Sequence, residues 1–95
     1  MEQTKSAYEQ KYQAQLDQMQ ARIDQLSAKV KHADAEAKLQ LESSLTKIKA
    51  RKEILENRLN GLRAAGDNAW QELKQGVADA ADDVSRAFAN ARSHF

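Results

Sequence analysis

The feature that most constrains this chain is a helical spacing of apolar residues that continues without a proline. From Tyr12 to Ala37 the apolar side chains recur at steps of four and three residues. This spacing places them on one face of an α-helix and follows the heptad pattern of coiled coils. The chain contains no proline, and its three glycines all follow residue 60. We therefore expect one long heptad helix within residues 1–60, running from about residue 5 for roughly 84 Å.

The register of this apolar face, which we call the seam, changes in the middle of the expected helix. From Ala37 the apolar steps are four, four and three, which places a stutter over residues 37–45. A stutter locally relaxes the left-handed supercoil of a coiled coil. The seam then continues through Lys52, whose aliphatic stem can pack while its ammonium stays in water. Leu39 and Ile54 lie off the seam, which indicates a helix covered on more than one side, as in a bundle.

Residues 61–69 are the one candidate break, and two alternatives stay open there. Gly66 suits the left-handed position that ends many helices, and Asn68 suits the N-cap of a new helix. Against a break, apolar residues stay eleven positions apart across this segment, as Leu62 and Leu73 do. The segment is thus either a hinge or turn, or part of a continuous or merely kinked helix.

Residues 70–95 repeat their apolar pattern every eleven residues. Eleven residues make three turns at 3.67 residues per turn, so such a pattern keeps its stripe nearly parallel to a straight helix axis. The stripe includes Trp70, Val77 and Phe88 and is narrow, with acidic residues on the opposite face. The tail is therefore predicted to be an amphipathic helix that packs into the groove of another helix.

A bare helix of the expected length would leave its apolar edge in water, so we expect it to have partners. The sequence predicts an all-α protein in which a long coiled-coil helix and a shorter C-terminal amphipathic helix assemble as a helical bundle. We expect a homo-oligomer, either a dimer or a tetramer. The predicted oligomer interface consists of the apolar residues of the seam and the tail: Tyr12, Leu16, Met19, Ile23, Leu26, Val30, Leu41, Leu45, Ile48, Leu55, Leu59, Leu62, Trp70, Leu73, Val77, Val84, Phe88 and Phe95.

The residues that carry chemistry are few and scattered. His32 and Glu36 have the spacing of a helical metal half-site, but the only other histidine, His94, is distant in the sequence. The basic run at residues 47–52 points around the helix and has no aromatic residue between its charges for base stacking. No cysteine, phosphate-binding glycine loop or activated nucleophile is evident. We therefore expect no enzymatic activity, no cofactor, no metal site and no binding of nucleic acid.

Charge and hydropathy give a weaker indication of where the protein resides. The formal net charge is +1, so the overall field favours neither acidic nor basic partners. The first residues contain no apolar run of the kind found in signal peptides, and no window approaches 18 consecutive apolar residues. We expect a cytoplasmic protein.

The end of the chain resembles a known type of protein. The residues that carry the resemblance are Trp70, Leu73, Lys74, Gly76, Val77, Ala80, Val84, Ala87, Phe88, Ala91 and Phe95. They resemble a loose group of small bacterial coiled-coil proteins, mostly of unknown function and sometimes linked to stress. More distantly, the repeats are similar to those of late-embryogenesis-abundant proteins and exchangeable apolipoproteins. The first resemblance implies a structural or stress-related role.

Two alternative functions stay open. One is binding to a lipid surface through the 70–95 helix, in which Trp70, Val77 and Phe88 would insert. The acidic polar face and the narrow stripe weigh against this role, because anionic lipids favour Lys and Arg. The other alternative is an adaptor that binds a helix of another protein.

Overall fold

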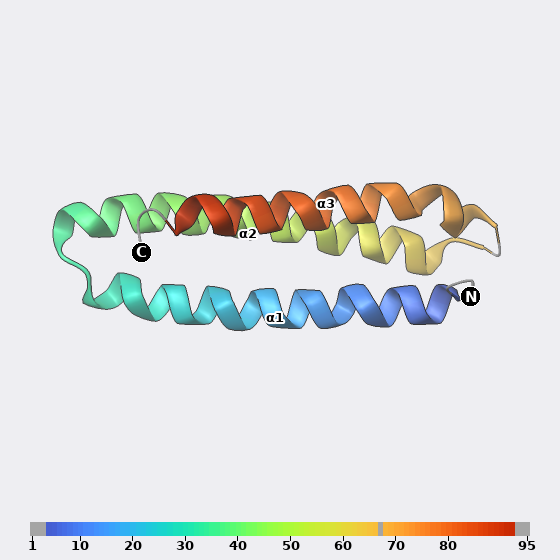
Figure 1. Ribbon diagram of the computed structural model, residues 1–95, viewed down its shortest axis with the longest axis horizontal. Helices are drawn as coiled ribbons and strands as arrows, with labels where there is room; N and C mark the ends of the chain where they lie inside the picture. Colours follow the sequence, from blue (N-terminus) through green and yellow to red (C-terminus); the bar gives the residue numbers. More distant parts are fainter. Residues whose placement is uncertain (1–3, 67, 93–95) are drawn as a thin grey trace.

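The computed structural model describes residues 4–66 and 68–92, and it places them in three helices. These are α1 (Lys5–His32), α2 (Ala35–Ala64) and α3 (Ala69–Ala91), with no strand among the described residues. The helices run up, down and up along one long axis, so α1 and α3 point the same way and α2 the opposite way (Figure 1). The molecule measures 51 × 21 × 17 Å. The prediction of an all-α protein is confirmed.

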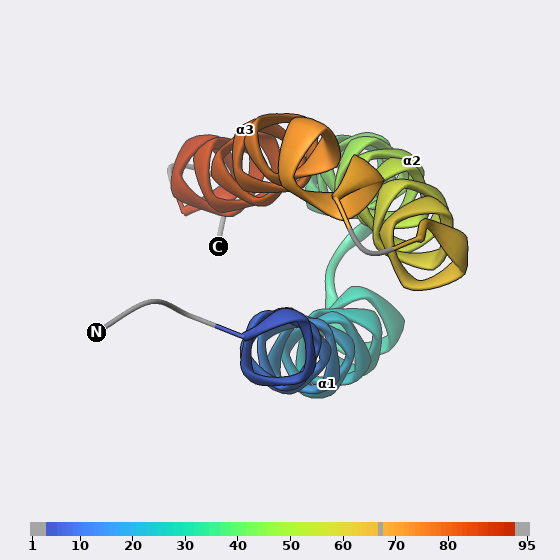
Figure 2. The ribbon, with the colours of Figure 1, turned by 90° about the vertical axis from the view of Figure 1, so that its right-hand side faces the viewer.

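Helix α2 is the element shared by both helix–helix contacts. In the end-on view α3 lies beside α2, and α1 lies across from this pair (Figure 2). The contacts between helices are mainly those of α2 with α3 and of α1 with α2. The apolar seam is therefore divided between α1 and α2, which pack against each other. Helix α3 packs against the apolar side chains that this pairing leaves uncovered.

The prediction of one long helix within residues 1–60 is wrong, because the chain turns at Ala33 and Asp34. Both residues are extended, with ψ angles of 154° and 169°. The Asp34 carboxylate accepts a hydrogen bond from the amide of Ala37 at 2.9 Å and so caps the first turn of α2. The turn lets each half of the seam cover the other within one chain. This hairpin replaces the expected rod of roughly 84 Å.

The second turn lies within the segment 61–69, so the chain is not continuously helical there. Helix α2 ends at Ala64, followed by Ala65 in an extended conformation with ψ of 145°. The glycine mechanism expected from the sequence is wrong, since no described glycine has a positive φ. Asn68 precedes α3 but makes no side-chain capping hydrogen bond. The amide of Trp70 instead donates to the carbonyl of Gly66 at 3.4 Å.

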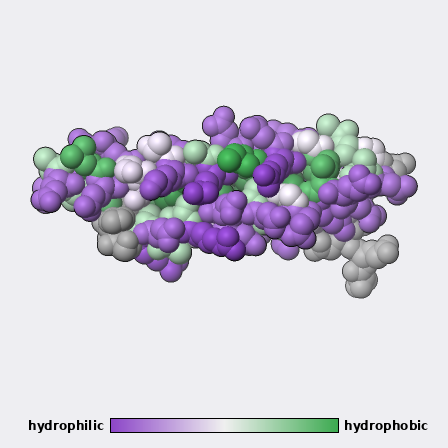
Figure 3. All heavy atoms as spheres, turned by 90° about the horizontal axis from the view of Figure 1, so that it is seen from above, coloured by the Kyte–Doolittle hydropathy of each residue, from purple (hydrophilic) through white to green (hydrophobic). Residues whose placement is uncertain are grey.

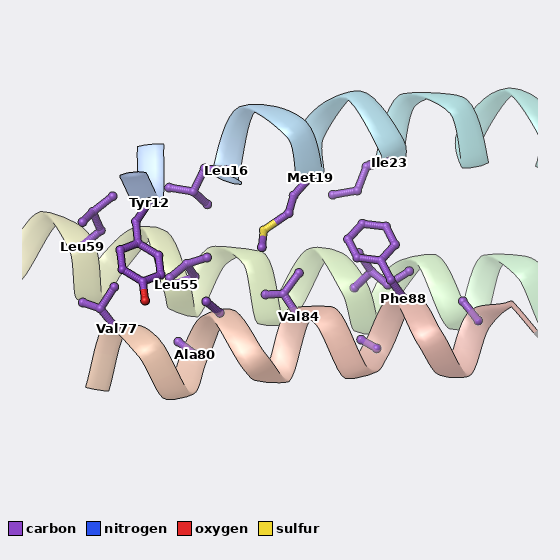
Figure 4. Close-up of a cluster of buried hydrophobic side chains, with 14 of the residues drawn as sticks. Tyr12, Leu16, Met19, Ile23, Leu55, Leu59, Val77, Ala80, Val84 and Phe88 are labelled. Atoms are coloured by element: carbon purple, nitrogen blue, oxygen red, sulfur yellow. The ribbon is translucent and has the colours of Figure 1, made fainter. Parts of the chain in front are cut away.

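The core runs along the whole bundle and is built from the seam of α1 and α2 and one face of α3. Figure 4 shows α1 side chains such as Leu16 and Met19 pointing toward Leu55 of α2 and Val84 of α3. Small residues on α3 let it lie close to its neighbours, because alanine adds little width to a helix. The buried alanines of α3 are Ala80, Ala81, Ala87 and Ala91.

Candidate interaction surfaces

Most residues of the predicted oligomer interface are buried inside a single chain. Leu26 is partly buried against the core, Leu73 is 41 % exposed, and Phe95 lies outside the described residues. One chain thus already covers the apolar edge that motivated the expected oligomer. Self-association stays a prediction, and it needs either an exposed surface or an exchange of helices. The buried members of the predicted interface are Tyr12, Leu16, Met19, Ile23, Val30, Leu41, Leu45, Ile48, Leu55, Leu59, Leu62, Trp70, Val77, Val84 and Phe88.

An aromatic cluster joins the first turns of α1 to the start of α3. The ring centroid of Tyr8 lies 4.8 Å from that of Tyr12 and 5.9 Å from that of Trp70. The Tyr8 hydroxyl donates a hydrogen bond to the carbonyl of Lys74 at 2.6 Å, and the Lys74 ammonium lies 4.5 Å from the Trp70 ring centroid. Burial, together with the neighbouring Tyr12, raises the pKa of Tyr8 above its usual value. The seam predicted from the sequence begins at Tyr12 and leaves out Tyr8, although Tyr8 stands one helical step earlier.

A second contact between distant parts of the chain caps the end of α2. The Lys5 ammonium donates to the carbonyls of Arg63 at 2.8 Å and of Ala65 at 2.7 Å. These carbonyls belong to the last turn of a helix, where acceptors lack partners within the helix and attract positive charge. The Arg63 guanidinium in turn donates to the side-chain oxygen of Gln13 at 2.6 Å. These contacts depend on the hairpin, so the sequence alone could not have indicated them.

Near the end of α3 a cation lies on the aromatic ring of the tail stripe. The guanidinium carbon of Arg22 lies 4.0 Å from the ring centroid of Phe88. Cation–π contacts of this kind contribute about 0.5–1 kcal/mol at exposed sites. Beside it, a shallow groove between α1 and α3 is lined by Leu26, Ala91 and Arg92. The contact between Arg22 and Phe88 therefore joins α1 to α3 at a second place, away from the aromatic cluster.

The residues considered for a metal site do not share one helix. His32 is the last residue of α1 and Glu36 lies in the first turn of α2, so the turn separates the two residues. The expected half-site assumed an unbroken helix, and that premise is wrong. Among the described residues there is no group of three His, Cys, Asp or Glu side chains that could hold a metal ion. His94 lies outside the described residues.

The basic run of α2 is divided between different surroundings. Lys52 is half-buried and forms an ion pair with Glu56 one turn later. Lys49 borders a groove that also contains these two residues. Lys47 and Arg51 instead border α3. The charges are therefore spread around the helix instead of forming one basic face.

The outward face of α2 carries an uncharged stripe of exposed residues. Leu39 is 71 % exposed and Ile54 is 47 % exposed, the highest values among the large apolar residues. Seen from above, over α2 and α3, the surface is largely hydrophilic with separate hydrophobic patches (Figure 3). Steps of four, three, four, four, three and four residues connect the members of the stripe. The outer stripe, as we call it, consists of Leu39, Ser43, Thr46, Ala50, Ile54, Asn57 and Gly61.

None of the helices, over the described residues, is long and apolar enough to cross a membrane. In comparisons with known proteins, the chain matches no family model, no curated protein and no solved structure. The resemblance drawn from the tail therefore stays a prediction, and any proposal of function depends on the geometry of this chain.

Proposed function

We propose that this chain is a non-enzymatic interaction protein that self-associates, and that the outer stripe of α2 is its contact surface. The outer stripe supports this proposal because it is a continuous uncharged track that stays exposed after the bundle has formed, and it contains Leu39 and Ile54, the two most exposed large apolar residues of the described chain. The seam and the α3 face are already covered within the chain. The stress-related role suggested by the tail stays a prediction.

The outer stripe is self-complementary in shape. Its spacing reads the same in both directions, with Ala50 at the centre. Two copies of α2 packed antiparallel would place Leu39 of one copy against Gly61 of the other, and Ile54 against Thr46. Each pair combines a large side chain with a smaller one, as packing of knobs into holes requires. Ala50 at the two-fold axis would let the helices approach closely.

The charges beside the outer stripe make this association weak and dependent on salt. On one flank, Lys49 of one copy would lie near Glu53 of the other, which is favourable. On the other flank, Lys47 would lie near Arg51, which is repulsive until salt screens the charges. The stripe covers residues 39–61, or roughly 34 Å of helix, which is short for a permanent interface. We expect a dimer that dissociates readily on dilution and forms better at moderate salt.

Sedimentation equilibrium over a range of protein and salt concentrations tests this proposal. An Ile54→Asp variant should weaken the association constant by about tenfold or more, since each copy would place a carboxylate in the contact. A Gln18→Asp variant adds the same charge at an exposed position of α1 and should leave association unchanged. Equal association in the wild type and in Ile54→Asp would contradict the proposed surface.

The lipid alternative would require α3 to leave the bundle. Its apolar residues Trp70, Val77, Val84 and Phe88 are buried, so the described fold does not present them to a membrane. Flotation with neutral and anionic vesicles tests this alternative. It predicts that the wild type floats and that Phe88→Asp does not.

A further inference from the structure

Two backbone torsion angles separate the α1–α2 hairpin from a continuous helix. Ala33 has φ −80° and ψ 154°, and Asp34 has φ −69° and ψ 169°. An α-helix has φ near −63° and ψ near −42°, so both φ angles are already close to helical and only the two ψ angles differ. The turn contains no glycine and no proline. Alanine is the strongest helix former, so Ala33 favours a continuous helix, and Asp34 is tolerated in a helix at a cost of less than about 1 kcal/mol.

The apolar seam passes through this turn without losing its register. Val30, Ala33 and Ala37 follow one another at steps of three and four residues, and the stutter begins only after the turn, at Ala37. If the turn became helical, these residues would lie along one side of a single helix. The apolar side of that helix would need a partner helix along its whole length. A single chain could not provide this partner, because it would no longer fold back at residues 33 and 34.

The pairing of α1 with α2 shows where two straightened chains would cross. The Lys5 ammonium contacts the carbonyl of Ala65, while Ile23 borders the same groove as Lys49, and Val30 the same groove as Glu42. These pairs are all centred near residue 36. A two-fold axis there would bring α1 of one chain onto α2 of the other, in the position that its own α1 occupies in the hairpin. Small residues, Ala33 and Ala37 among them, lie at the crossing.

We propose that two copies of this chain form a dimer by exchanging α1, with residues 5–64 of each copy straightened into one helix. The partner is a second copy because every contact needed already exists within one chain. The Tyr8 hydroxyl would donate to the Lys74 carbonyl of the other copy, and Arg22 would cover the other copy's Phe88. Exchange uses the core and not the outer stripe, so it stands apart from the contact proposed for α2.

The turn decides the balance between hairpin and exchanged dimer, because the core contacts are the same in both. The hairpin keeps the N-cap that Asp34 provides for α2. The straight helix loses this cap but gains helical hydrogen bonds for amides and carbonyls on either side of the turn. Association costs translational and rotational entropy, so the dimer gains with protein concentration. Interconversion is slow, because α1 must leave the core before it can be exchanged.

Two substitutions at the turn should shift this balance in opposite directions. Ala35 is the first residue of α2, where proline is well accepted, and Asp34 before it is already extended as proline requires. Within a continuous helix the same proline would remove a hydrogen bond and clash with the preceding turn. Ala35→Pro therefore preserves the hairpin and prevents exchange. Asp34→Ala removes the cap and adds a strong helix former, so it favours exchange.

The experiment refolds each protein from urea over a wide range of concentrations and measures mass by light scattering and shape by small-angle X-ray scattering. For the wild type we expect a concentration-dependent dimer with a maximum dimension of about 90 Å, the length of the straightened helix, against 51 Å along the axis of the hairpin monomer. Asp34→Ala should raise the dimerisation constant about thirtyfold, since both copies lose a cap. Ala35→Pro should lower it by a factor of at least ~1,000, since both copies would need a broken helix.

Two results would overturn the exchange. The first is a dimer of Ala35→Pro as abundant and as long as that of the wild type. The second is a wild type and an Asp34→Ala variant that both stay monomeric after concentrated refolding. The rate of dissociation separates exchange from the outer stripe. An exchanged dimer should persist on dilution and survive Ile54→Asp, whereas a dimer that dissociates at once and is lost in Ile54→Asp contradicts exchange and supports the outer stripe.

Discussion

Tyr8 brings a hydroxyl into the core, and a backbone carbonyl of α3 accepts a hydrogen bond from it. Its side chain is 5 % exposed, and the hydroxyl bonds the carbonyl of Lys74, in the second turn of α3. An unpaired hydroxyl at such a site would cost free energy, so the hydrogen bond fixes where α1 meets α3. A single residue thus helps to set the position of one helix along another.

The raised pKa of Tyr8 predicts a loss of stability in alkali. Above pH 10 the tyrosine of the unfolded chain ionises, whereas burial keeps Tyr8 neutral in the folded chain. The unfolded state then holds fewer protons than the folded state, so the free energy of unfolding falls as the pH rises. Tyr8→Phe should cost about 1 kcal/mol at neutral pH and show a smaller fall above pH 10.

Urea unfolding of both proteins at neutral pH and in alkali measures this difference. Tyr12→Phe is the matched control, because it removes the hydroxyl of the neighbouring ring in the same aromatic cluster. If the wild type and Tyr8→Phe lose stability equally in alkali, buried Tyr8 is not the source of the loss.

At the scale of the helices, α2 contains a glycine where a helix gains nothing from one. Gly61 lies inside α2 and is exposed. A Cβ added there would meet no heavy atom within 4 Å outside the neighbouring backbone. Gly61→Ala should therefore stabilise the monomer by about 0.5–1 kcal/mol through helix propensity. Thermal unfolding of a dilute sample measures this gain. Because Gly61 is also the small residue opposite Leu39 in the proposed contact, the same change should weaken association through the outer stripe.

The two turns show what sequence reasoning about elements can find. The turn within 61–69 coincides with two glycines, although the eleven-residue spacing continues across it, so it could be recognised as one of two alternatives. The turn at Ala33 and Asp34 contains no glycine, and the seam keeps its register through it. Its one local sign is an aspartate placed to cap the first turn of α2. The apolar faces themselves could be predicted from the sequence, because a periodic apolar face must be buried whether it packs within one chain or against another.

At the scale of the whole molecule, one core links all three helices, which predicts a single unfolding transition. Trp70, the only tryptophan, is 6 % exposed and reports on the junction of α1 and α3. Helical circular dichroism reports on the whole chain. In a cooperative two-state transition the two signals coincide. Tryptophan fluorescence that changes at lower urea than the dichroism would show instead that α3 separates before the α1–α2 hairpin unfolds.

The odd number of helices has a consequence for anything joined to this protein. Because the path runs up, down and up, α1 begins at one end of the long axis and α3 runs away from that end (Figure 1). Two domains attached at the start of α1 and the end of α3 would be kept apart by a stiff spacer instead of being brought together. Tandem copies fused in this way would extend into a strut, whereas a bundle with an even number of helices would return each attachment to the side from which it came.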